Sequence, residues 1–523
     1  MSLASAALGG APLDPDDLHL SARSPVDGRA IRYHADEFAA SWMAVLAEEL
    51  GRSAHFAAAA GVFDREMLLM HLENALHYEL MGVCRAYTRR KHLKSQGYVS
   101  AKAVECPVEL ISLVRSRWPD ASIALTPRAH PMAYVRRLAR ARHRVVEFIA
   151  RTTGRANAAA GSRPVIAVEI VEGADPHQKS EAFWLADPAV DPGEVLFVFD
   201  RNNRTLLKVE AEHAAITALG AKAVALHPSV SADGKIPLWV PPRAPKWLRN
   251  FRAAFARPRS STERWLVRTL RDFAETVWRW ESFFRHFNVC IYQQFTEFAP
   301  DIAAKRVAID RVGGIELGKM RSQFFNRSCA SFYFQHEIAL VWHENVQDVL
   351  GLARTRTREV VAVGYVWSHL FKSLAPEARA LRAKLTASGV KRVLVIFDNA
   401  IHPNGRFSMP DLEAFYARVV DVALHCEDIG LIVKSKKREL LGRMPAIDAS
   451  LRRLEGEGRC LILDKHGESI VPAALAADLV LAIPASTAAC EAALGGRNVL
   501  MYDPSGSLHH PLCGNEKGVI HND

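Results

Sequence analysis

The segment best suited to chemistry lies near the C-terminal end of the sequence. An apolar run at 477–483 is followed by the hydroxyl pair Ser486 and Thr487 and by an Ala-rich stretch that carries Glu491. This order predicts a buried strand, a turn and a short helix. The first turn of such a helix has free backbone N–H groups, which together with two hydroxyls can hold a phosphate. A carboxylate one turn further along can accept hydrogen bonds from ribose hydroxyls.

A purely structural interpretation of the same segment also stays open. Ser and Thr are preferred at the first position of any helix, where their side chains bond the helix's own N–H groups. Glu491 can reach such a cap as well. The segment therefore predicts either a phosphate-binding site or an ordinary helix cap.

Two further sets of polar residues follow predicted strands in the same half of the chain. Asp398 and Asn399 come directly after the apolar run 391–397, in a loop that Asn and Gly make tight enough to approach a phosphate. Lys434 ends the run 430–433, where its ammonium can neutralise a leaving phosphate. Ligands of open α/β sheets bind at the carboxyl ends of strands. A turn-only role for Asp398 and Asn399 is the alternative.

His336 and Glu337 follow a predicted strand at 330–335 in the other half of the chain. We expect them at the carboxyl end of that strand, facing the second half of the molecule. A His beside a carboxylate suits removal of a proton from an acceptor hydroxyl, although a structural His is the alternative. Near them, Trp367 can stack on a base or sugar and His369 can bind phosphate.

The elements that position these residues are short apolar runs that alternate with helix-compatible segments, a pattern typical of parallel sheets covered on both faces. The first series lies at 164–171, 194–200, 221–227, 287–292, 330–335 and 360–365, and the second at 391–398, 430–434, 460–464 and 477–483. The sequence therefore predicts an α/β protein with two Rossmann-like domains that face each other across a cleft and join near 373–377.

The predicted organisation has four parts. We expect a disordered N-terminus, a helical accessory region, a first Rossmann-like domain that binds the acceptor and contains a helical insertion at 241–286, and a second Rossmann-like domain that binds the nucleotide-sugar. Their ranges are 1–30, 31–160, 161–375 and 376–523.

Length, charge and cysteines narrow the class of protein. The chain of 523 residues is too long for one core, and its net charge of +10 favours acidic partners. No nucleic-acid-binding motif is present. The eight cysteines are scattered without metal-ligand spacing, as in a reducing compartment. With no signal peptide and no apolar run of spanning length, we expect a cytoplasmic protein, at most peripheral on the inner membrane.

One segment could make such a membrane contact. Within 243–259, Trp247, Phe251 and Phe255 recur every four residues and six cations surround them. This pattern predicts either a helix that lies on an anionic membrane surface or an amphipathic helix that packs on its own domain. A second basic run, 85–94, is expected to be a solvated face.

Together the motifs resemble those of bacterial surface-polysaccharide glycosyltransferases of the GT-B type. More distantly, they are similar to those of CDP-glycerol glycerophosphotransferases and of Kdo- or sialic-acid-type transferases. The resemblance spans about 164–523 and is carried by Gly313-Gly314, 331–337, 397–399, Val433-Lys434 and the Ser486-Thr487…Glu491…Gly495 block.

The resemblance implies a metal-independent enzyme without a cofactor, and no Asp-x-Asp motif follows a predicted strand. It would move a sugar from a nucleotide donor, such as a CMP-linked acidic sugar, to a surface polysaccharide or a lipid-linked glycan. The implied catalytic residues are His336, Glu337 and Asp398. The implied donor-binding residues are Asn399, Lys434, Ser486, Thr487 and Glu491. A CDP-polyol phosphotransferase, a non-catalytic scaffold of polysaccharide assembly and an epimerase are the alternatives.

The chain departs from the family patterns in three places. Glu337 stands where such families often have Gly, which leaves its role open, and no His-Pro precedes Lys434, which puts that residue's assignment in doubt. GT-B chains usually end in a helix that crosses back to the first domain. The resemblance therefore implies that the sequence is cut short after Asp523.

Overall fold

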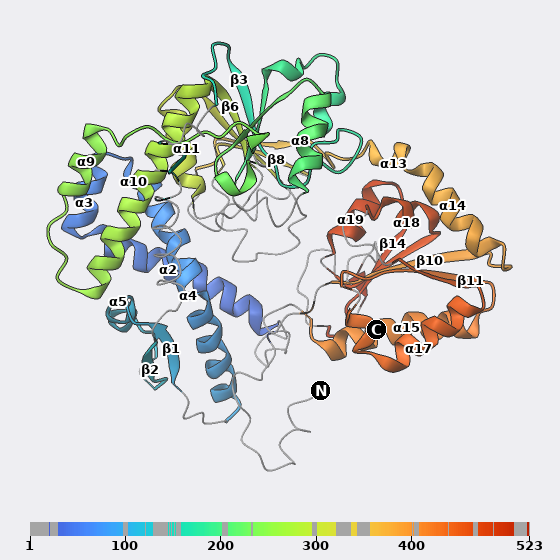
Figure 1. Cartoon of the computed structure of the whole chain (residues 1–523). Coiled ribbons are helices and arrows are strands. Elements are labelled where there is room, and N and C mark those ends of the chain that lie inside the picture. The colour runs from blue at the N-terminus through green and yellow to red at the C-terminus, as the bar shows by residue number, and fades with distance from the viewer. Residues whose placement is uncertain are drawn as a thin grey trace.

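The computed structural model describes most of the chain. It covers residues 30–97, 103–120, 122–128, 158–200, 208–231, 234–294, 301–320, 336–342, 356–399, 407–437, 439–463, 469–484 and 486–506, and single positions at 20, 145, 147, 149–150, 152, 401 and 520–521. Two parallel sheets, each with helices on both faces, lie side by side, and an N-terminal group of helices packs against the first (Figure 1).

The N-terminal region is built on three helices. These are α2 (Ile31–Gly51), α3 (Ala54–Ala60) and α4 (Arg65–Ser95), and the side chains of Ser53 and Asp64 cap the starts of α3 and α4. A small parallel sheet, which the sequence did not predict, pairs β1 (Val104–Pro107) with β2 (Leu125–Arg128) beside α5 (Ile111–Ser116).

The basic run at 85–94 is not the solvated face that its charge suggested. It forms the last turns of α4, and Arg89, Arg90 and His92 are buried. The reason is the position of α4, which has α2, α10, α11 and β1 against it.

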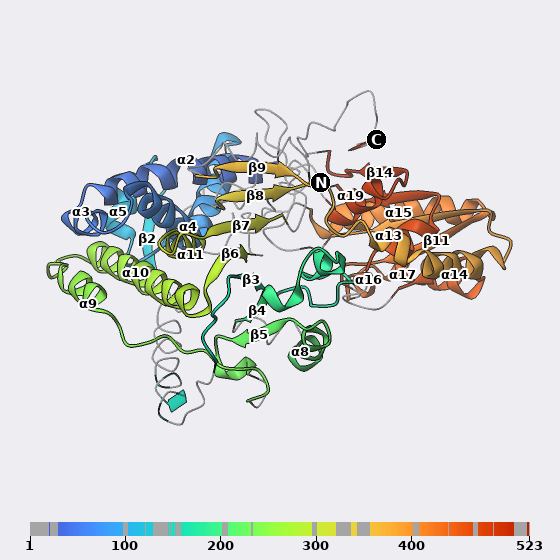
Figure 2. The same ribbon diagram turned by 90° about the horizontal axis from the view of Figure 1, so that it is seen from above.

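The first domain contains a seven-stranded parallel sheet in the order β5-β4-β3-β6-β7-β8-β9, which Figure 2 shows from above. The strands are β3 (Val165–Glu169), β4 (Val195–Phe199), β5 (Lys222–Ala225), β6 (Val289–Gln294), β7 (Ile315–Lys319), β8 (Ile338–Val341) and β9 (Glu359–Ala362). The strand expected at 330–335 lies outside the described residues, and β7 and β8 were not predicted.

Helices cover both faces of this sheet. Val165 and Ala167 pack with α10 on one face, and Val168 and Phe197 pack with α8 on the other. The helices are α8 (Val209–Ala218), α9 (Lys246–Ala253), α10 (Ser261–Phe287) and α11 (Ile302–Asp310), with single 3-10 turns at η2 (Phe183–Ala186), η3 (Pro192–Glu194) and η4 (Pro228–Val230). A capping box of Ser260 and Glu263 begins α10.

The aromatic face of α9 is part of the protein core, so it is not available to a membrane. Phe251 and Phe255 are buried, and Phe63 of the N-terminal region meets Phe251 edge to face at 5.5 Å. Arg252 pairs with Glu275 of α10 at 2.8 Å. The expectation that 243–259 lies on an anionic membrane is therefore wrong, and the amphipathic alternative holds. Within the described residues, no helix combines the length and the apolarity needed to cross a bilayer.

The second domain contains a six-stranded parallel sheet in the order β12-β11-β10-β13-β14-β15. The strands are β10 (Arg392–Phe397), β11 (Ile429–Lys434), β12 (Cys460–Ile462), β13 (Leu479–Ala482), β14 (Val499–Tyr502) and β15 (Ile520–His521). Val393 and Val395 face one core and Leu394 and Ile396 the other. Burial on both faces explains why these strands are continuous apolar runs.

The described helices of the second domain form two layers, one on each face of its sheet (Figure 1). On one face lie α14 (Ala375–Thr386), α18 (Val471–Ala476) and α19 (Thr487–Leu494). On the other lie α15 (Met409–His425), α16 (Glu439–Gly442) and α17 (Pro445–Gly456). The expected pair of Rossmann-like domains is thus confirmed.

The domains meet through an apolar cluster that draws on both. Trp342, Tyr365 and Trp367 follow β8 and β9 of the first domain, and they pack with Val471 at the start of α18. The connection itself runs through α13 (Leu370–Ser373) into α14. The carboxyl ends of the first sheet's strands therefore face the second domain.

The contact between Gly318 of β7 and the His336 side chain can be tested by stability. A Cβ atom at Gly318 would overlap the imidazole ring of His336. We expect Gly318→Ala to lower the free energy of unfolding by about 1–3 kcal/mol, as for other overpacked cores. Gly82→Ala in α4 is the matched control, because a Cβ there meets nothing within 4 Å. Denaturant unfolding measures both variants, and equal stabilities would contradict the packing described.

Candidate functional site

The second sheet has a topological switch point between β10 and β13. From this central pair the chain proceeds to β11 on one side and to β14 on the other. Phe397 pairs in register with Ala482, so the segments that carry Asn399 and Ser486 leave the sheet at the same level. Such a switch point is where open α/β sheets bind ligands. The structure thus brings together two of the sets that the sequence placed at strand ends.

The start of α19 is not capped by the hydroxyl that precedes it. Ser486 occupies the N-cap position in an extended conformation and is buried, yet its side chain makes no capping hydrogen bond. Thr487 is the first residue of the helix and is half-buried. Capping therefore does not account for Ser486, and the first-turn N–H groups keep the polarity that favours an anion.

Asp398 holds a neighbouring loop in place and does not have the open carboxylate expected of a catalytic acid or base. Its Oδ2 accepts hydrogen bonds from the hydroxyls of Tyr416 at 2.9 Å and Ser435 at 2.6 Å, and Oδ1 accepts the Lys436 N–H at 2.5 Å. Burial raises its pKa, against the effect of these donors. We assign Asp398 a positioning role, because it fixes the loop after β11 and with it Lys434, which is half-buried at the strand end.

Glu491 lies at the boundary between the domains. Its side chain is 5% exposed, and Oε1 is 3.0 Å from Nζ of Lys179, which belongs to the loop after β3 of the first domain. The buried Tyr365 hydroxyl lies near Glu491, and burial together with this carboxylate raises the pKa of Tyr365. The sequence singled out Glu491 but not Lys179 or Tyr365, because nothing near Lys179 in the chain indicates a partner 312 residues away.

The loop that carries Lys179 is held by a second buried carboxylate. Glu181 Oε2 accepts the backbone N–H groups of Val171, Glu172 and Gly173 at 3.0, 2.8 and 3.2 Å. Lys319, at the end of β7, places its ammonium 3.9 Å from the other oxygen of Glu181. Burial raises the pKa of Glu181, while Lys319 and the N–H groups oppose that effect. These contacts fix the backbone at the carboxyl end of β3.

Trp367 connects the two lysines. Its ring is fully buried, its Nε1 donates to the Ser180 carbonyl at 2.7 Å, and the ammonium groups of Lys179 and Lys319 lie 4.6 and 4.3 Å from the ring centroid. Such distances give cation–π attraction. The indole ring is therefore covered by other side chains of the protein, and the expectation that it stacks on a base or sugar was wrong.

His336 and Glu337 are not at the expected end of a strand. They precede β8, so they lie at its amino end, whereas the second domain meets the carboxyl ends. His336 is fully buried, with Nδ1 2.5 Å from Glu316 Oε1, and Glu337 pairs with Arg358 at 2.7 Å. The expected placement was wrong because the strand begins after these residues. Glu316, which the sequence did not single out, binds both of them.

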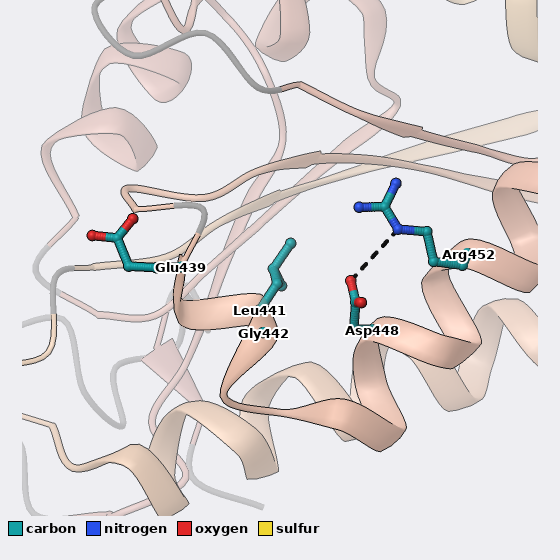
Figure 3. A pocket seen from close by; sticks show the side chains of 5 residues that line it. All are labelled: Glu439, Leu441, Gly442, Asp448 and Arg452. Carbon is teal, nitrogen blue, oxygen red and sulfur yellow. Dashed lines mark ion pairs between the residues drawn. The ribbon is translucent and has the colours of Figure 1, made fainter.

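A cavity elsewhere in the second domain is separate from these residues. It has a volume of about 430 Å³ and is lined by Glu439, Leu441, Gly442, Asp448 and Arg452 of α16 and α17 (Figure 3). Asp448 and Arg452, four residues apart on α17, form an ion pair at 3.7 Å on one wall of the cavity (Figure 3). None of the residues proposed from the sequence lines it. Among the described residues, no group of three or more His, Cys, Asp or Glu side chains is placed to hold a metal ion.

Comparison with known proteins relates the chain to polysaccharide biosynthesis. Residues 320–522 match the family described as polysaccharide biosynthesis PFTS motif protein. This range contains β8 to β15 and therefore the whole switch point at β10 and β13. The match confirms the link to polysaccharide synthesis that the sequence resemblance indicated. No curated protein matches the chain.

Solved structures with a similar arrangement are remote in sequence. A glycosyltransferase from Rickettsia africae is 10% identical, with 69% of this chain and 84% of that chain covered and a TM-score of 0.36. HepE of Anabaena in complex with UDP-glucose is 12% identical, with 69% and 85% covered and a TM-score of 0.34. A variant of the wall teichoic acid polymerase TagF is 9% identical, with 65% and 70% covered and a TM-score of 0.30. Because this similarity is remote, we base the function on the chain's own residues and on the family match.

The positioning role of Asp398 can be tested by stability. Asp398→Ala leaves the Tyr416 hydroxyl and the Lys436 N–H without this acceptor, while the Ser435 hydroxyl keeps the Lys437 carbonyl at 2.9 Å, and we expect a loss of roughly 2–3 kcal/mol in the free energy of unfolding. Asp421→Ala, at an exposed position of α15, is the control and should change stability little. If urea unfolding gives the same midpoint for both variants, Asp398 does not hold the loop.

Proposed function

We propose that the protein is a glycosyltransferase that moves a sugar from a nucleotide donor to a polysaccharide or a lipid-linked glycan. One observation carries the proposal. The uncapped start of α19, with Ser486 and Thr487, stands at the switch point of a doubly wound sheet, inside the range that matches a polysaccharide biosynthesis family.

The matched range contains the proposed phosphate-binding segment. Pro484, Ser486 and Thr487 all lie within residues 320–522.

The side chains around the switch point suit a nucleotide phosphate. Ser486, Thr487 and the first N–H groups of α19 would bind it, Lys434 would offset its charge, and Asn399 would donate from the end of β10. Glu491 would accept hydrogen bonds from the ribose hydroxyls. In the transfer, the acceptor oxygen bonds to the anomeric carbon and the bond from that carbon to the phosphate oxygen breaks. The electron pair leaves on the phosphate, and the hydroxyl proton passes to a base.

A CMP-linked acidic sugar is the donor that we propose within this class. The net charge of +10 favours an anionic donor and acceptor. The binding groups named above contact phosphate and ribose, which all nucleotide donors share. They do not distinguish one base or sugar from another, so an experiment must identify the donor.

Nucleotide release identifies the donor. The full chain is incubated with CMP-, CDP- and UDP-linked donors and with a glycan acceptor, and we expect CMP from a CMP-sugar. Release of CMP from CDP-glycerol would show a polyol-phosphate transferase instead, and conversion of a UDP-sugar without an acceptor would show an epimerase. If no nucleotide is released and none raises the melting temperature, the protein is not an enzyme of this class and a scaffold role takes its place.

Variants at α19 test the site. Ser486→Ala with Thr487→Val removes two hydroxyl donors with little change in volume. We expect kcat/KM to fall about 10-fold or more, because each hydrogen bond to a charged phosphate contributes roughly 1.5–3 kcal/mol. Ser450→Ala, which removes a half-buried hydroxyl of α17, is the control. Unchanged kcat/KM in the double variant would place the donor elsewhere.

A further inference from the structure

The burial of Glu491 calls for an explanation that its own helix does not supply. Its neighbours on the helix are Thr487, Cys490, Leu494 and the alanines at 488, 489, 492 and 493, so no cation of its own helix lies beside the carboxylate. A buried carboxylate is costly unless it is paired. The partner at 3.0 Å is Lys179, which comes from the other domain.

Lys179 is presented by a backbone that is fixed on both sides. The Ser180 carbonyl accepts the Trp367 Nε1–H at 2.7 Å, and the Ser180 hydroxyl donates to the Asp175 carbonyl at 2.6 Å. Glu181 holds three N–H groups at the end of β3. In contrast, the Lys179 side chain is 30% exposed. A flexible four-carbon stem on a rigid loop can redirect its charge without moving the fold.

Two lysines and three carboxylates carry the charge in this region: Lys179 with Glu491, Lys319 with Glu181, and Glu172, which acts on Glu181 and Tyr365. Lys319 is almost fully buried, and its ammonium lies 3.9 Å from Glu181. These two charges offset each other on the first-domain side. If the Glu491 carboxylate turns to neutral ribose hydroxyls, the positive charge of Lys179 is left at the boundary, one helical turn from Thr487.

We propose that Lys179 is a donor-binding residue that the first domain contributes to the nucleotide site of the second. This inference rests on the proposed function. When the donor binds, the ion pair between Glu491 and Lys179 breaks. The Glu491 carboxylate then accepts hydrogen bonds from the ribose, and the Lys179 ammonium moves to the donor phosphate at the start of α19. Glu491 and Thr487 are four residues apart on the helix, so the required shift is about one helical pitch, ~5.4 Å. The donor then contacts both domains.

Calorimetric titration separates phosphate contacts from the rest of the nucleotide. UDP, CDP and CMP are titrated into the full chain, and uridine and cytidine are titrated as the matching compounds without phosphate. For Lys179→Met we expect about a 10-fold or greater loss of affinity for the nucleotide that the wild type binds, whereas the affinity for the nucleoside should not fall. Lys179→Arg should keep most of the affinity, and the salt dependence of nucleotide binding should be weaker in Lys179→Met.

Lys384→Met is the matched control, because it removes the same charge at an exposed position of α14. Glu491→Gln should weaken nucleoside and nucleotide alike, since its contact is with the ribose. Thermal melting shows that each variant is folded.

Two results would overturn the proposal. If Lys179→Met binds the nucleotide as tightly as the wild type, Lys179 does not contact phosphate. If it binds nucleotide and nucleoside more tightly, Lys179 only blocks Glu491. When the wild type binds no nucleotide at all, the proposed function fails first, and that outcome is distinct from both.

Discussion

The pairing of buried charges at the domain boundary is the constraint on which the arrangement of the site depends. Glu181 and Glu491 are both buried, and the burial of a carboxylate is costly unless a cation and hydrogen-bond donors lie beside it. Lys319 and Lys179 supply the cations, and the ring of Trp367 lies against both ammonium groups. Removal of one member would leave another buried without its partner, so the loop after β3, the end of β7 and helix α19 are fixed relative to one another.

The topology of the two sheets brings these elements to one place. In both sheets the first strand lies in the middle and the chain proceeds first to one side and then to the other, so each has a switch point at its centre. Parallel strands end at the same edge, and the carboxyl edge of the first sheet faces the second domain. Polar residues that follow strands in either domain can therefore serve one ligand.

Some sequence patterns gave a wrong prediction because the same residue spacing is compatible with two different placements in the fold. The aromatic residues of α9 recur as they would on a membrane surface, but packing against Phe63 and α10 buries them in the core. His336 was expected to follow a strand, but β8 begins after it. His336 therefore lies at the amino edge of the sheet and not at the carboxyl edge. Asp398 was proposed from its place after a strand, and the fold surrounds its carboxylate with the three donors of Tyr416, Ser435 and Lys436, which the local sequence does not indicate.

The sequence by itself determined the two parallel sheets and the strand ends at Asn399, Lys434 and Ser486, because apolar runs bounded by turns follow from burial on both faces of a sheet. It also determined the helix start at Thr487, since the order of apolar, hydroxyl and Ala-rich residues is local. Only the tertiary structure decided that Lys179 meets Glu491 and that the ring of Trp367 lies against Lys179 and Lys319, because these contacts join residues up to 312 positions apart. Charge pairing over such separations depends on how whole domains pack, and no spacing within the chain records it.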